Sequence, residues 1–140
     1  MKTNPARLLG LLAASLLFVV FARADDAAAP YAQILKKRDA ALSQILAFRE
    51  SRYATGAYGE ESVLSARLAL WSFRRDIATS SAEKIRQQEL IVSVWEKRLA
   101  VVESQFKSGL TDREAVLLAT DSLLQVQQLL EELRPQPKKG

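Results

Sequence analysis

The stretch Ser104–Leu118, SQFKSGLTDREAVLL, predicts a turn between two helices. We expect Gly109 to end the first helix as a left-handed C-terminal cap, with Leu110 folding back on the preceding turn. Thr111 and Glu114 have the spacing of a capping box, in which side-chain oxygens accept bonds from unpaired backbone N–H groups. The leucine-rich run that follows is therefore predicted to be the next helix.

The same arrangement occurs 53 residues earlier, in the stretch SRYATGAYGEESVLS. Tyr53 there corresponds to Phe106, and Gly56 corresponds to Gly109. This constant offset indicates an internal duplication of about residues 50–77 and 103–130. The first copy lacks a side-chain oxygen at the matching capping position, which predicts a looser turn.

Apolar residues recur at helical spacing on both sides of the two turns. We expect one helix from Pro30 to Thr55 and a second from about Gly59 to Ile77. A third should begin at a capping box formed by Ser80 with Glu83 and run to the Gly109 turn, and the fourth should end at Pro135.

The third helix has a near-heptad apolar seam in which Gln88 is the one polar residue. No segment after residue 24 alternates convincingly between apolar and polar residues, so a sheet is not expected. The predicted fold is an all-α, antiparallel, up-down-up-down bundle of four helices, with the Gly56 and Gly109 turns at one end. The alternative is a continuous helix through Ser80, which would place the two turns at opposite ends of a three-helix array.

Residues 1–24 have the features of a secretory signal peptide. Lys2 and Arg7 precede the uncharged run LLGLLAASLLFVVFA, and Ala22-Arg23-Ala24 fits a cleavage site. We expect export to the periplasm, with no stable membrane span after cleavage. Residues 25–134 would then form the bundle, and residues 135–140 a disordered tail.

The composition argues against most catalytic chemistry. The chain has neither histidine nor cysteine, which removes the usual nucleophile–base pairs and most transition-metal ligands. Glu50 and Glu103 occupy equivalent positions in the two repeats, but we expect them to be solvated helix-face residues. Basic and acidic residues are interspersed, so no nucleic-acid-binding patch is expected. We predict no enzymatic activity, no cofactor and no metal.

The two repeats resemble the periplasmic helix-turn-helix tips of the outer-membrane efflux (TolC) family. The residues that carry this resemblance in the first copy are Tyr53, Gly56, Val63, Leu64, Ala66 and Leu70, and in the second copy Phe106, Gly109, Leu110, Val116, Leu117, Ala119 and Leu123. The resemblance implies a coiled-coil end that meets the hairpin of an efflux adaptor protein. It does not extend to the family's barrel, because only about thirty residues separate the two motifs.

These observations predict a non-enzymatic, periplasmic interaction protein that binds a protein partner, or a second copy of itself, through its turns. The candidate binding residues are Tyr53, Gly56, Ala57, Tyr58, Phe106, Gly109, Leu110 and Thr111. The alternative is a small periplasmic chaperone or stress-response protein, which would leave a broad apolar face open after folding.

Overall fold

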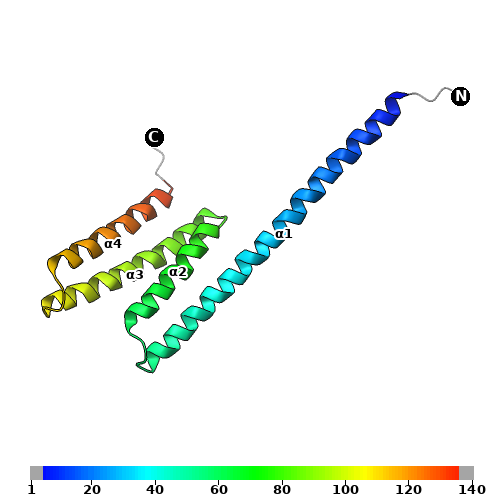
Figure 1. The fold of residues 1–140 in the computed structure, drawn as a ribbon. Helices are drawn as coiled ribbons and strands as arrows, with labels where there is room; N and C mark the ends of the chain where they lie inside the picture. The colour runs from blue at the N-terminus through cyan, green and yellow to red at the C-terminus, as the bar shows by residue number, and fades with distance from the viewer. Residues whose placement is uncertain (1–4, 136–140) are drawn as a thin grey trace, which may run out of the picture. The chain divides into compact units, whose positions relative to one another are not determined.

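The structure is a computed structural model that describes the backbone of residues 5–135 and the side chains of residues 29–135. It contains four helices, α1 (Pro5–Ala54), α2 (Glu60–Ile77), α3 (Ser81–Lys107) and α4 (Arg113–Leu133), and no strand in this part of the chain (Figure 1). The predicted all-α class with four helices is confirmed.

The chain divides into two units, residues 1–38 and residues 39–140, and α1 runs through both. Pro30 lies inside α1, so the predicted helix start at that residue is wrong. The alanines at 27–29 have the highest helix propensity, which recovers part of the cost of the hydrogen bond that Pro30 cannot donate.

Two predictions fall largely outside the described residues. The side chains of the signal segment, residues 1–24, are not described, and of the predicted tail, residues 135–140, only Pro135 is. Within the part of the chain that the structure describes, no helix has the length and apolar character needed to cross a membrane.

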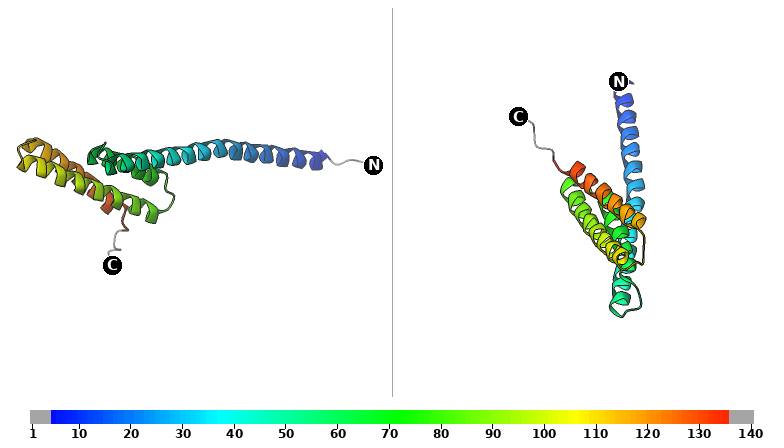
Figure 2. Two further views of the ribbon diagram at one scale, coloured as in Figure 1. Left: turned by 90° about the horizontal axis from the view of Figure 1, so that it is seen from below. Right: turned by 90° about the vertical axis from the view of Figure 1, so that its left-hand side faces the viewer.

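In the second unit, α2 packs against α3 and α3 packs against α4. Figure 1 and both views of Figure 2 show α3 and α4 side by side. The helix break predicted at Ser80 is confirmed, because the Ser80 hydroxyl accepts a bond from the Glu83 N–H at the start of α3. The chain therefore reverses between α2 and α3, which returns the Gly109 turn to the end that carries the Gly56 turn.

The buried core of the second unit lies mainly on α2 and α3, and α4 adds a smaller share. Its apolar members are Val63, Leu64, Ala66, Leu70, Phe73, Ile91, Val92, Val94, Ala119 and Leu130. Gln88, predicted as the polar residue of the α3 seam, is fully buried at its centre. Its Nε2 donates to the Val126 carbonyl at 2.7 Å, and its Oε1 accepts from Arg75 Nη1 at 2.9 Å, so this amide connects α2, α3 and α4.

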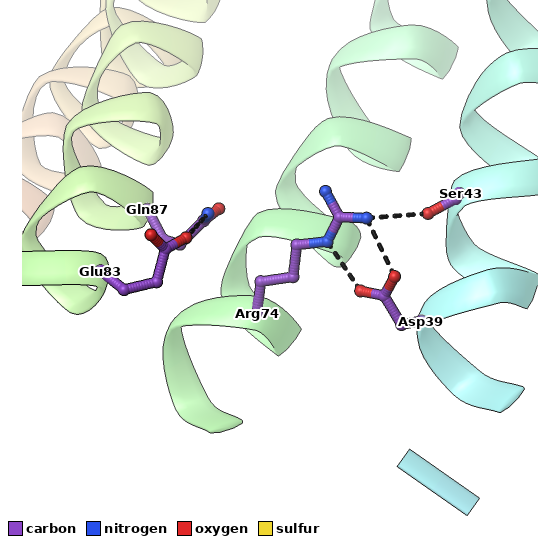
Figure 3. Close-up of polar contacts among 5 residues, drawn as sticks. All are labelled: Asp39, Ser43, Arg74, Glu83 and Gln87. Carbon is purple, nitrogen blue, oxygen red and sulfur yellow. Dashed lines mark hydrogen bonds and ion pairs between the residues drawn. The ribbon is translucent and has the colours of Figure 1, made fainter. Parts of the chain in front are cut away.

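Long polar side chains connect α1 to α2. Arg74 donates to both carboxylate oxygens of Asp39, at 2.7 and 2.9 Å, and to the Ser43 hydroxyl at 3.0 Å (Figure 3). Arg67 pairs with Glu50 at 2.8 Å. None of the α1 residues from 39 to 54 is buried. This pairing therefore rests on charged hydrogen bonds more than on apolar packing.

The bond from Arg74 lowers the pKa of Asp39 below its ordinary value, and the attraction between the two charges adds to this effect. Partial burial of the carboxylate acts in the opposite direction but does not outweigh them. The bond to the Asp39 carboxylate in turn raises the pKa of the Arg74 guanidinium. Asp39 is thus held in its charged form when the helices are paired.

Candidate protein-binding site

The first candidate turn, between α1 and α2, is closed by backbone bonds around Gly56. The Gly56 N–H donates to the Tyr53 carbonyl at 2.9 Å, and the Ala57 N–H donates to the Arg52 carbonyl at 2.9 Å. Gly56 has a φ of 72°, in the left-handed region that glycine adopts without steric cost. These two bonds and this conformation define a Schellman motif.

The second candidate turn, between α3 and α4, repeats this geometry. The Gly109 N–H donates to the Phe106 carbonyl at 3.0 Å, the Leu110 N–H donates to the Gln105 carbonyl at 2.8 Å, and Gly109 has a φ of 70°. Each donor and acceptor corresponds to its counterpart in the first turn at the same offset of 53 residues. The glycine caps predicted from the sequence are confirmed at both turns.

The helix after the second turn starts one residue later than predicted. Its N-cap is Asp112, whose Oδ1 accepts from the Ala115 N–H at 2.9 Å, so the predicted Thr111 cap is wrong. Both residues offer a side-chain oxygen, and the carboxylate has the advantage of its charge at the positive end of the helix dipole. The first turn has Gly59 as N-cap with no side-chain bond, as predicted.

The side chains at the two turns are strongly exposed. Leu110 is 78% exposed, which contradicts the prediction that it folds back on α3. In a Schellman motif this position packs against a residue in the last helical turn, which here is Gln105. Gln105 is polar and exposed, so it offers Leu110 no apolar surface. Tyr53 and Phe106 are also exposed, at 47% and 45%.

Tyr58 packs against α1. Its ring meets the Phe48 ring edge-on at 6.2 Å between centroids. Together they form one wall of a shallow groove whose other residues are Ala41, Gln44, Ile45 and Arg49. Of these residues, Tyr58 is singled out from the sequence and Phe48 is not. The available signal was a second apolar stripe on α1, formed by residues 41, 45 and 48.

The structure groups the predicted residues in two places. Tyr53, Gly56, Ala57 and Tyr58 lie at the first turn, and Phe106, Gly109, Leu110 and Thr111 lie at the second. Because α3 has 27 residues and α2 has 18, α3 is about 13 Å longer at 1.5 Å per residue. Figure 1 accordingly shows the two turns as separate features at the same end of the second unit.

The carboxylates near the turns form no reactive cluster. Glu50 is paired with Arg67, and Glu103 is exposed on α3. No group of three or more potential metal ligands occurs in the described part of the chain. The arrangement can present apolar and aromatic side chains on rigid turns, which is suited to contact with another protein.

We compared the chain with models of protein families, with curated proteins and with solved structures. None of the three comparisons finds a match.

Proposed function

We propose that this chain is a non-enzymatic, exported helical protein that binds a protein partner through its two glycine turns. The resemblance of these turns to TolC-type tips favours a hairpin of a periplasmic efflux adaptor as the partner. Export rests on the signal-like residues 1–24.

The observation that carries this proposal is the repetition of one exposed turn geometry. Two Schellman motifs, 53 residues apart, hold their glycines at φ values of 72° and 70°. The backbone bonds and caps explain how these turns stabilise the helix ends, but they do not require an exposed apolar side chain. Yet Leu110, at 78%, is more exposed than any other large apolar side chain of the described residues. Exposed apolar groups on a rigid turn are suited to docking in an apolar pocket of a partner.

The test is recovery of a partner from periplasmic extract by the tagged chain. Leu110→Asp adds a charge where the proposal places an apolar contact, and should abolish recovery of the proteins bound by the wild type. Ile34→Asp is a matched control, because Ile34 is also exposed, at 60%, but belongs to neither turn. Equal recovery by wild type and Leu110→Asp would refute binding through the second turn.

Tyr58→Asp tests the first turn in the same assay. This residue covers Phe48, so circular dichroism should first establish that the variant keeps its helices. A partner that binds both turns should be lost from either variant. A partner lost only from Leu110→Asp would restrict the site to the second turn.

A second candidate, a small periplasmic chaperone, is favoured by the apolar side chains left open on α1 and α4. Ile45 and Phe48 are 44% and 52% exposed, and Leu117, Leu118 and Leu124 are 57–62% exposed. A chaperone should suppress the light scattering of an unfolding client protein when present at several-fold molar excess. Unchanged scattering would count against this candidate and leave the first one standing.

A further inference from the structure

The two outer helices of the second unit, α1 and α4, each carry a row of apolar side chains that stay largely exposed. On α4, which packs against α3, Leu117, Leu118 and Leu124 are 58%, 62% and 57% exposed. Their spacing of about one heptad places them on one side of the helix, together with Glu114 and Asp121. This set of five residues is called here the α4 face.

The α4 face carries negative charge. Neither Glu114 nor Asp121 takes part in a salt bridge with another described residue. Asp121 accepts a bond from the neutral Gln125 at 2.6 Å, which leaves its charge uncompensated. A partner for this face should therefore combine apolar side chains with cations.

The outer side of α1 within the second unit has that combination. Its apolar residues are Ala41, Ile45 and Phe48, which line the groove closed by Tyr58. The Arg52 guanidinium lies over the Phe48 ring, 5.3 Å from its centroid. We call Ala41, Ile45, Phe48 and Arg52 the α1 face.

The charge of the α1 face is positive because the acids on this stretch of α1 are already paired. Asp39 is bound by Arg74 and Glu50 by Arg67, so neither neutralises Arg52. Two copies of the α1 face would repel each other, whereas the α4 face complements it in charge.

We propose that the α1 face of one chain binds the α4 face of a second copy of the same chain. The two faces have similar lengths, about 16 Å each, since residues 41–52 and 114–124 rise by 1.5 Å per residue. An antiparallel alignment that places Phe48 against Leu118 also places Arg52 against Glu114 and Ile45 against Asp121, so Glu114 is the acid that meets a cation directly. Figure 1 shows α4 apart from the α1 residues of the second unit, so this contact forms between chains.

This inference goes beyond the proposed function, because it uses the sides of α1 and α4 and not the ends of the turns. The interface joins two different surfaces, so it extends to a ring or a filament unless two copies exchange both faces. Association would cover the apolar side chains that otherwise favour the chaperone candidate.

The absence of cysteine makes disulfide trapping a direct test. Two differently tagged full-length chains, one Phe48→Cys and the other Leu118→Cys, are produced in the same cells and exposed to a mild oxidant. A disulfide requires Cβ atoms about 4 Å apart, so it forms only between side chains that meet. We expect a cross-linked pair that carries both tags.

The matched control pairs Phe48→Cys with Lys97→Cys. Lys97 is exposed, as Leu118 is, but lies on α3, outside both faces. Cross-linking of the Leu118 pair no greater than that of the Lys97 pair would overturn the proposal.

Charge reversal then tests the alignment. Arg52→Glu in the chain with Phe48→Cys, or Glu114→Arg in the chain with Leu118→Cys, should each reduce cross-linking about fivefold, as expected for an exposed ion pair. Both substitutions together should restore it. Single reversals without effect, or a double reversal weaker than either single one, would refute the Arg52–Glu114 pairing.

Adding Leu110→Asp to both cross-linking chains separates this inference from the proposed function. The substitution should leave cross-linking unchanged while it abolishes partner recovery. Loss of cross-linking on Leu110→Asp would show that copies meet through the turns, and would overturn the pairing of the α1 and α4 faces.

Discussion

Replacement of Gln88 by alanine should strongly destabilise the second unit. The Gln88 side chain is fully buried, and its amide bridges a carbonyl of α4 and a guanidinium of α2. Loss of the neutral bond to Val126 costs about 1 kcal/mol, and loss of the bond from Arg75 costs about 1.5 kcal/mol. Hydrogen bonds to charged groups contribute about 1.5–3 kcal/mol. The lower end of this range applies here, because Arg75 keeps two bonds to Asp76 and is partly accessible to water.

The loss of buried side-chain volume adds to this cost. Removal of the Gln88 Cγ methylene forfeits about 0.8 kcal/mol of apolar burial. The expected total is about 3 kcal/mol. With a urea dependence of about 1.5 kcal/mol per molar for a unit of this size, the unfolding midpoint should fall by about 2 M.

Urea unfolding followed by far-ultraviolet circular dichroism and tryptophan fluorescence measures this change. Gln105→Ala is the matched control, because Gln105 is on the same helix, is exposed, and makes no side-chain bond to another described residue. Gln88→Leu keeps the volume but not the hydrogen bonds, and should still cost about 2.5 kcal/mol, the share of the two lost bonds. A Gln88→Ala midpoint within about 0.3 M of the Gln105→Ala midpoint would refute the assignment of this amide as the connection between three helices.

Three further predictions concern the caps and the charged bridge. Gly109→Ala should cost about 1 kcal/mol in thermal or urea unfolding, because φ is 70° while no atom lies within 4 Å of the added Cβ. Asp112→Ala should cost about 1 kcal/mol in the same measurement, whereas Thr111→Ala should be nearly neutral, and the reverse order would place the cap at Thr111. The lowered pKa of Asp39 means that its bond to Arg74 stabilises the fold above the unfolded-state pKa of about 4 and is lost as the pH falls through the lower folded-state pKa. The difference in unfolding free energy between wild type and Asp39→Asn should therefore be constant at about 0.5–1 kcal/mol from pH 5 to 7 and should shrink as the pH falls through the lowered folded-state pKa, and a difference that stays constant into acid would exclude ionisation as its source.

Local features of the second unit were predictable because they depend on few neighbouring residues. A helix cap is made by atoms within about six residues of one another, so the sequence predicts Gly56, Gly109 and Ser80 at their observed positions. One error at this level is a shift of one residue between competing caps, and the other is the start of α1, which lies 25 residues before the predicted Pro30. The N-cap of α4 is Asp112 and not the predicted Thr111, because these adjacent residues both offer a side-chain oxygen. The sequence predicts a helix start at Pro30, but a helix can continue through a proline, and α1 does so.

The sequence predicts which residues lie at the two turns but not how their side chains are arranged. The offset of 53 residues pairs Tyr53 with Phe106 before any coordinates are known. It does not show that Tyr58 turns back on Phe48 while Leu110 stays exposed. That difference depends on what each side chain meets across the turn.

The sequence by itself determined the helices, the turns between them and the side of each helix that carries apolar residues, because these follow from spacing along one chain. Only the tertiary structure decided which apolar residues are covered. Leu42 and Leu46 are half-buried while Ile45 and Phe48, on the adjacent stripe of α1, stay open to solvent. A helix with two apolar stripes can bury both only if a neighbour covers each one, and periodicity does not reveal the number of neighbours. In this chain α2 lies beside one side of α1, and α3 beside one side of α4, which leaves the outer faces of these two edge helices uncovered.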